Sequence, residues 1–141
     1  VGKYPQVVAF ALDGNISENL AAASAAAGEI AYGETRRGTL TDQTFLHTYT
    51  FAGRAGDVVT ITLRAATFDT YLDLLQTDGK VIAFNDDVGA NADDLASTDS
   101  QITAFSLPHN GVYTIRATRF GRETARGAVG DYELRLRAAQ P

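Results

Sequence analysis

The chain has 141 residues, of which 45% are hydrophobic and 21% are charged, and its net charge is −5. These values fit one globular domain with its own core and exclude a chain that is disordered throughout. The lack of cysteine excludes disulfides, zinc–thiolate sites and thiol nucleophiles. No apolar run approaches the ~20 residues of a membrane-spanning helix, and an acidic chain without a basic aromatic groove is a poor binder of nucleic acid.

Residues 1–32 read as an N-terminal extension without a dominant period. The run Val7–Leu12 fits an extra strand. For Ser17–Ala27 we favour a short helix, because its first residue suits an N-cap and Gly28 suits a C-cap. The alternative is an irregular segment of small residues that lies across the rest of the domain.

Residues 33–137 are dominated by a period of two, as in Val59, Ile61 and Leu63, which alternate with polar residues. Turn signals such as Asp78-Gly79 separate the alternating runs. The predicted strands span residues 35–41, 45–52, 57–64, 71–76, 80–84, 101–107, 112–118 and 131–137. Short strands at this spacing predict an all-β fold, a jelly-roll-like antiparallel β-sandwich of about eight strands. Residues 138–141 read as the start of a linker.

Short motifs follow one another in a fixed order along this region. They include Gly33-Glu34-Thr35, Tyr49-Thr50-Phe51, Ala55-Gly56-Asp57, Asp69-Thr70-Tyr71-Leu72, Asn85-Asp86-Asp87, Gly111-Val112-Tyr113 and Gly130-Asp131-Tyr132. In this order and spacing they resemble the bacterial pre-peptidase C-terminal domain family, relatives of the collagen-binding domains of clostridial collagenases. The resemblance implies a jelly-roll sandwich that serves as an accessory module on secreted or cell-surface bacterial proteins, and several relatives bind calcium.

Two departures from the family pattern concern a calcium site of the collagenase type. His47 stands where the family usually has an acidic residue, and no acidic-Pro-Asn segment is found near the N-terminus. Both departures argue against a collagenase-type site near Asp42. They leave the aspartate-rich stretch between residues 69 and 99 untouched.

That stretch holds eight aspartates and one lysine, a charge of −7. Asp69 precedes one predicted strand, Asn85–Asp87 follows the next strand of the same hairpin, and Asp99 precedes the strand after it. A hairpin brings its open ends together, and crowded carboxylates repel one another unless a cation neutralises them. Calcium takes six to eight hard oxygen ligands. We therefore predict calcium as a cofactor, and the predicted ligands are Asp69, Asn85, Asp86, Asp87 and Asp99.

The alternative is a solvated acidic loop in which Asp and Asn cap strand ends. Asp73 is a weak ligand candidate, because it alternates with two leucines and is expected to face outward. Catalysis has little support, since His47 is expected near solvent, His109 falls in a turn, and neither belongs to a catalytic motif. We predict that the chain is not an enzyme.

Aromatic residues suggest where a ligand would bind. Tyr49, Phe51, Tyr113 and Tyr132 alternate in strands and are expected in the core, which leaves as surface aromatics Tyr4, Tyr32, Tyr71 and Phe120. Phe120 lies in the arginine-flanked segment 119–126, a plausible contact surface, although a plain hairpin loop is the favoured reading.

Together, the residues and the resemblance predict a non-catalytic, calcium-stabilised accessory module of a larger secreted or cell-surface bacterial protein. It would assist attachment, folding or targeting of a neighbouring domain. Two alternatives stay open. One is a module that binds an extracellular protein or polysaccharide, and the other is a module that self-associates through an exposed edge strand.

Overall fold

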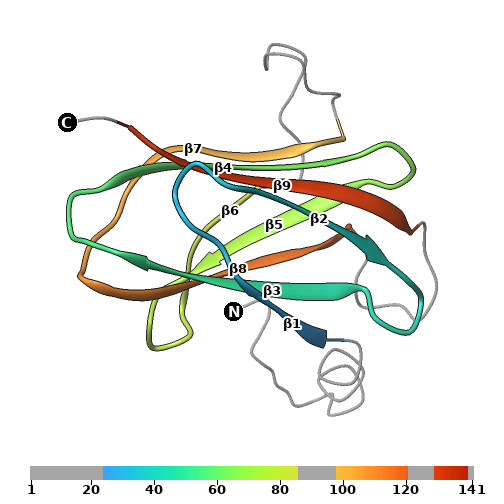
Figure 1. The fold of residues 1–141 in the computed structure, drawn as a ribbon, viewed down its shortest axis with the longest axis horizontal. Helices are drawn as coiled ribbons and strands as arrows, with labels where there is room; N and C mark the ends of the chain where they lie inside the picture. The colour runs from blue at the N-terminus through green and yellow to red at the C-terminus, as the bar shows by residue number, and fades with distance from the viewer. Residues whose placement is uncertain (1–23, 86–97, 121–128, 140–141) are drawn as a thin grey trace.

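The structure is a computed structural model that describes residues 24–85, 98–120 and 129–139. These residues form strands, turns and loops, with no helix among them (Figure 1). The strands are β1 (Ser24–Glu29), β2 (Thr35–Leu40), β3 (Leu46–Gly53), β4 (Val58–Ala65), β5 (Thr70–Leu75), β6 (Val81–Asn85), β7 (Ser100–Ser106), β8 (Gly111–Arg119) and β9 (Gly130–Ala138).

Two sheets pack face to face (Figure 1). The five-stranded sheet has the order β1-β3-β8-β5-β6, and the four-stranded sheet has the order β2-β9-β4-β7. Every pair is antiparallel except β1–β3, which is parallel. Early and late strands are neighbours within each sheet, so the five-stranded sheet is complete only with β8 and the four-stranded sheet only with β9. The predicted all-β sandwich is confirmed, and each of the eight predicted strands ends within one residue of the observed bounds.

The predicted helix over Ser17–Ala27 is wrong for its last four residues, which lie in β1. Alanine favours a helix in isolation, but here the segment pairs in parallel with β3, from Ser24 opposite Leu46 onward. A bulge between Ala26 and Gly28 interrupts the ladder, and Gly28 takes a φ of 123° that suits glycine. The first part of the predicted helix and the predicted strand at Val7–Leu12 lie outside the described residues.

The core lies between the sheets and consists of the inward-facing residues of the alternating strands. Leu63, Leu72, Leu74, Ile115 and Leu134 are fully buried. The four aromatic residues predicted for the core are also buried, namely Tyr49, Phe51, Tyr113 and Tyr132.

The loops gather at the two ends of the sandwich. We call one the Asp69 end, where β5 and β7 begin and β6 ends, close to the loop of residues 41–45. We call the other the Tyr32 end, which carries the turns at residues 30–34, 54–57, 76–80 and 107–110. Each end presents one candidate site.

Candidate functional site

The structure brings three of the predicted calcium ligands to the Asp69 end. Asp69 directly precedes β5, Asn85 closes β6, and Asp99 directly precedes β7. The chain segments are tied together because the Thr70 N–H and hydroxyl both donate to the Thr98 carbonyl oxygen, at 3.0 and 2.9 Å. Asp86 and Asp87 lie outside the described residues.

Asn85 and Asp99 use side-chain oxygens to cap backbone groups. The Gln101 N–H donates to Asn85 Oδ1 at 3.1 Å, a bond that joins the edge strands of the two sheets. The Ala65 N–H donates to Asp99 Oδ1 at 3.1 Å, and Asp99 is only 3% exposed. These bonds match the strand-end capping that sequence reasoning kept as the alternative to calcium.

The donor chemistry suits a hard cation, but the described donors are fewer than calcium needs. The described ranges, 24–85, 98–120 and 129–139, contain no group of three or more His, Cys, Asp or Glu side chains that could hold a metal. Calcium takes six to eight oxygen ligands, which is more than the described carboxylates at this end supply. Calcium therefore stays a prediction.

A protein cation occupies the neighbourhood of Asp42. Arg119 Nη1 lies 3.0 Å from Asp42 Oδ1, and the Arg119 side chain is 1% exposed. The guanidinium carbon also lies 4.1 Å from the centre of the Phe45 ring, a cation–π contact. A buried guanidinium thus supplies positive charge to Asp42.

Two sequence expectations about single residues are wrong. Asp73 does not face solvent: it is fully buried and forms an ion pair with Arg116, at 2.9 Å. Alternation placed Asp73 on the outer face correctly, but it cannot tell whether that face is covered. His47 points into the sandwich, where its Nδ1 lies 2.7 Å from the Tyr132 hydroxyl, and burial lowers its pKa.

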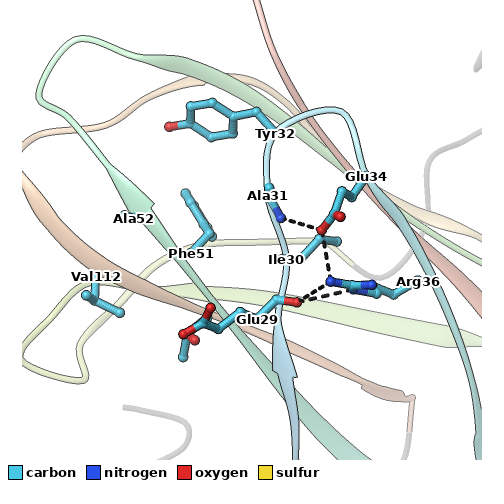
Figure 2. Close-up of a pocket in the computed structure, with 10 residues that line it drawn as sticks. Glu29, Ile30, Ala31, Tyr32, Glu34, Arg36, Phe51, Ala52 and Val112 are labelled. Carbon is cyan, nitrogen blue, oxygen red and sulfur yellow. Dashed lines mark hydrogen bonds and ion pairs between the residues drawn. The ribbon is translucent and has the colours of Figure 1, made fainter.

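The candidate functional site is a groove at the Tyr32 end, with a volume of about 600 Å³ (Figure 2). It is bounded by the end of β1, the β1–β2 connection, the start of β2 and the last part of β3, with one residue from the start of β8. Its lining residues are Glu29, Ile30, Ala31, Tyr32, Glu34, Arg36, Thr50, Phe51, Ala52 and Val112. This volume falls within the range of about 300–1,000 Å³ that is typical of ligand sites.

Backbone hydrogen bonds fix the β1–β2 connection that forms one wall. The Ile30 N–H donates to the Thr50 carbonyl of β3 at 2.9 Å, and the Gly33 N–H donates to the Leu136 carbonyl of β9 at 2.7 Å. The connection is thus tied to both sheets as it crosses between them. The wall is preorganised, which lowers the entropy that a ligand must overcome on binding.

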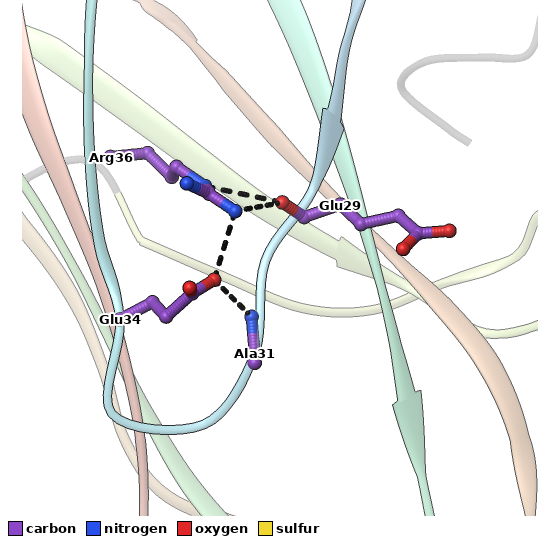
Figure 3. A network of polar contacts seen from close by, with 4 residues as sticks. All are labelled: Glu29, Ala31, Glu34 and Arg36. Carbon is purple, nitrogen blue, oxygen red and sulfur yellow. Dashed lines mark hydrogen bonds and ion pairs between the residues drawn. The ribbon is translucent and has the colours of Figure 1, made fainter.

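A polar network holds the same connection from inside the turn (Figure 3). Arg36 donates to the Glu29 carbonyl oxygen from Nε at 3.2 Å and from Nη2 at 2.9 Å. Glu34 Oε1 accepts from Arg36 Nη2 and from the Ala31 N–H, both at 2.9 Å. Arg36 and Glu34 therefore neutralise each other.

An aromatic ring and an aliphatic side chain give the groove its apolar surface. Tyr32 is 37% exposed, and its ring centre lies 6.0 Å from that of the buried Phe51. The Tyr32 hydroxyl donates to Asp57 Oδ2 at 2.7 Å, and burial raises the tyrosine pKa, so this hydroxyl stays protonated. Val112 is 52% exposed. A rigid aromatic beside exposed aliphatic surface is typical of protein interfaces.

The groove could not be predicted from the sequence, because its members come from three separate segments and the family motifs that contain some of them do not mark a binding site. The one signal was Tyr32, which the strand pattern left as a surface aromatic. Of the other predicted surface aromatics, Phe120 is 59% exposed, and Tyr71 stacks on the exposed Phe84 at 6.2 Å between ring centres. Tyr4 lies outside the described residues.

The sandwich has counterparts among known proteins. The family model of the bacterial pre-peptidase C-terminal (PPC) domain matches residues 46–119, from the start of β3 to the end of β8 and just over half of the chain. The chain belongs to this family. The resemblance seen in the sequence is thus confirmed, and PPC domains are non-catalytic accessory domains of larger proteins.

Solved structures show the same fold for this PPC domain. It is similar to the pre-peptidase C-terminal domain of a Bacillus anthracis collagenase, with a TM-score of 0.61 and 17% identity over 81% of this chain and 96% of that one. It is also similar to PliG, a periplasmic inhibitor of g-type lysozyme. The Aeromonas hydrophila protein has a TM-score of 0.59 and 18% identity over 83% of this chain and 100% of that one. Salmonella Typhimurium PliG has a TM-score of 0.55 and 12% identity over 79% of this chain and 98% of that one.

No curated protein matches the sequence of this chain. Within the ranges that the structure describes, no helix has the length and apolar character needed to cross a membrane.

Proposed function

We propose that this PPC domain is a non-catalytic binding module of a larger exported bacterial protein and that it contacts a partner protein through the groove at the Tyr32 end. The observation that carries the proposal is the groove itself. It presents Tyr32, which lies on a connection that is hydrogen-bonded to both sheets, and Val112, which lies on β8. Such a surface orders few side chains on binding, which favours affinity.

The comparisons support this proposal at the level of the fold. PliG structures have the same sandwich and are named as inhibitors of another protein, so this architecture is compatible with protein binding. The collagenase PPC domain is part of a larger protein, which supports an accessory role in attaching or targeting a neighbouring domain. The periplasmic neighbours and the family support location outside the cytoplasm.

The test is a binding panel for the isolated chain, with g-type lysozyme, collagen and a soluble polysaccharide as probes. We expect a protein probe to bind and Val112→Asp to weaken that binding at least tenfold. This substitution puts a charge into the apolar part of the groove while changing an exposed side chain. Circular dichroism checks that the variant stays folded.

The matched control is Phe120→Asp, which adds the same charge at the Asp69 end on a side chain that is 59% exposed. It should leave binding unchanged. Loss of binding in Phe120→Asp alone would instead place the site at segment 119–126. Binding of polysaccharide with no protein binding would reject the proposal.

We also propose calcium stabilisation at the Asp69 end. The support is the convergence of Asp69, Asn85 and Asp99 on one edge, with Thr70 bonded to Thr98 between them. Free calcium at 100 times its dissociation constant should stabilise the fold by about 2.7 kcal/mol. The measurement is thermal melting with calcium and with EDTA, and an unchanged melting curve would reject the idea.

A further inference from the structure

The charges that line the groove do not cancel. Arg36 and Glu34 form an ion pair at 2.9 Å, and Arg36 also donates two hydrogen bonds to the Glu29 carbonyl oxygen. Glu29 thus contributes to the network through its backbone, whereas its carboxylate points away from Arg36 and Glu34 (Figure 3). Among the described residues, no hydrogen bond or ion pair is assigned to this carboxylate. The groove lining therefore carries one uncompensated negative charge.

This carboxylate lies beside apolar surface. Figure 2 shows the Glu29 side chain on the side of the groove that Val112 borders, with Phe51 and Tyr32 along the rest of it. Val112 is 52% exposed and offers aliphatic contact area. The groove therefore combines an apolar wall with an anionic group at its rim.

Outside the lining, the rim adds further negative charge. Asp57 accepts the Tyr32 hydroxyl at 2.7 Å and the Arg54 N–H at 3.0 Å. These hydrogen bonds, that of Tyr32 first, lower the pKa of Asp57, so it is ionised at neutral pH; Arg54 is the nearby positive charge. The whole chain carries −5, which speeds approach of a positively charged partner and slows that of an acidic one.

Lysine and arginine side chains have the complementary chemistry. Each has an aliphatic stem that packs on apolar surface and a cationic head that pairs with carboxylates or lies over aromatic rings. Resting on the function proposed above, we propose that the groove takes a lysine or arginine side chain of a basic partner protein. In this arrangement Glu29 pairs with the cationic head and Val112 contacts the stem.

The test uses three blocked peptides that differ at one position: acetyl-Gly-Lys-Gly-amide, its norleucine analogue and its glutamate analogue. Each is titrated into the ¹⁵N-labelled chain while the amide signals of residues 29–36, 50–52 and 112 are followed by NMR. Norleucine keeps the aliphatic stem and lacks the charge. We expect the lysine peptide to bind these residues more tightly than the norleucine peptide by roughly two- to fivefold, the usual gain from one exposed ion pair. The glutamate peptide should not bind.

Variants assign the charge effect to one residue. Glu29→Gln should reduce lysine binding toward the norleucine level and weaken its dependence on salt. Val112→Ala should weaken both peptides alike, because it shortens the stem contact. The matched control is Glu133→Gln, which removes one negative charge from the four-stranded sheet, where Glu133 pairs with Arg37, and should leave lysine binding unchanged.

The outcomes separate this inference from the proposed function. Equal binding of lysine and norleucine peptides, lost in Val112→Asp, would keep the groove as the binding surface and overturn the cationic ligand. A salt-dependent preference for lysine that survives Glu29→Gln would overturn the role of Glu29. If no peptide shifts the groove signals, the inference is wrong, and the binding panel alone then decides the proposed function.

Discussion

The burial of Asp73, which forms an ion pair with Arg116, should make the stability of this PPC domain fall as the pH rises. Asp73 is fully buried on β5, and Arg116 on the neighbouring β8 is 21% exposed along its side chain. Burial raises the pKa of Asp73 from 3.8 to about 6, and Arg116, which favours the charged form, offsets only part of that effect. We would replace Asp73 with Asn, which keeps the shape and cannot ionise.

The magnitude follows from the two pKa values. One pKa unit corresponds to 1.36 kcal/mol, so the difference between the pKa values of 3.8 and about 6 corresponds to roughly 3 kcal/mol. The folded-state value is the higher one, so between these values the folded chain holds a proton that the unfolded chain has released. The stabilisation is present below pH 3.8 and is lost as the pH rises through about 6.

The assay is urea unfolding at a series of pH values from about 3 to 7, for the wild-type chain and Asp73→Asn. The wild type should lose roughly 3 kcal/mol more than the variant across this range. Asp57→Asn is the control of opposite sign: hydrogen bonds lower the pKa of Asp57, so its contribution is lost only as the pH falls. Parallel pH profiles for wild type and Asp73→Asn would refute the reasoning.

Three further variants test the packing. Leu74→Ala removes a fully buried core side chain and should cost about 2–5 kcal/mol in urea unfolding; a cost below about 1 kcal/mol would mean that the core collapses around the gap. Tyr132→Phe removes the hydroxyl that lies 2.7 Å from His47 Nδ1 and 2.5 Å from the Tyr49 hydroxyl, and should cost about 1–3 kcal/mol. An unchanged unfolding midpoint would show that water replaces this hydroxyl. Gly38→Ala should lower the melting temperature, because a Cβ there would overlap the Tyr132 ring, and a melting temperature at or above the wild-type value would contradict this packing.

Most of the strands could be predicted because alternation reports directly which face of a strand is buried. Val59, Ile61 and Leu63 show the signal, and all three are fully buried in β4. β1 could not be predicted in this way. Its sequence, Ser-Ala-Ala-Ala-Gly-Glu, has no alternation, and its strand conformation depends on pairing with β3, which is distant in sequence.

The sites were harder to predict than the strands, for a related reason. Alternation assigned Asp73 to the outer face but gave no measure of how that face is covered. The hairpin predicted from the sequence brings Asp69, Asn85 and Asp99 to one end. The sequence does not indicate that Asn85 and Asp99 accept hydrogen bonds from backbone N–H groups. The groove depends on a turn that crosses between the sheets, and a local pattern does not specify such a crossing.

The parallel pairing of β1 has a mechanical consequence. Ser24 lies opposite Leu46 at the Asp69 end, whereas Ala138 lies opposite Val59 at the Tyr32 end. A pull between these two points therefore runs along the strands. It loads the β1–β3 ladder, and the ladders on both sides of β9, in shear, so many hydrogen bonds resist together instead of opening one at a time. In a polypeptide with further domains on both sides, this PPC domain would transmit tension along its long axis, with the groove lying beside the line of force.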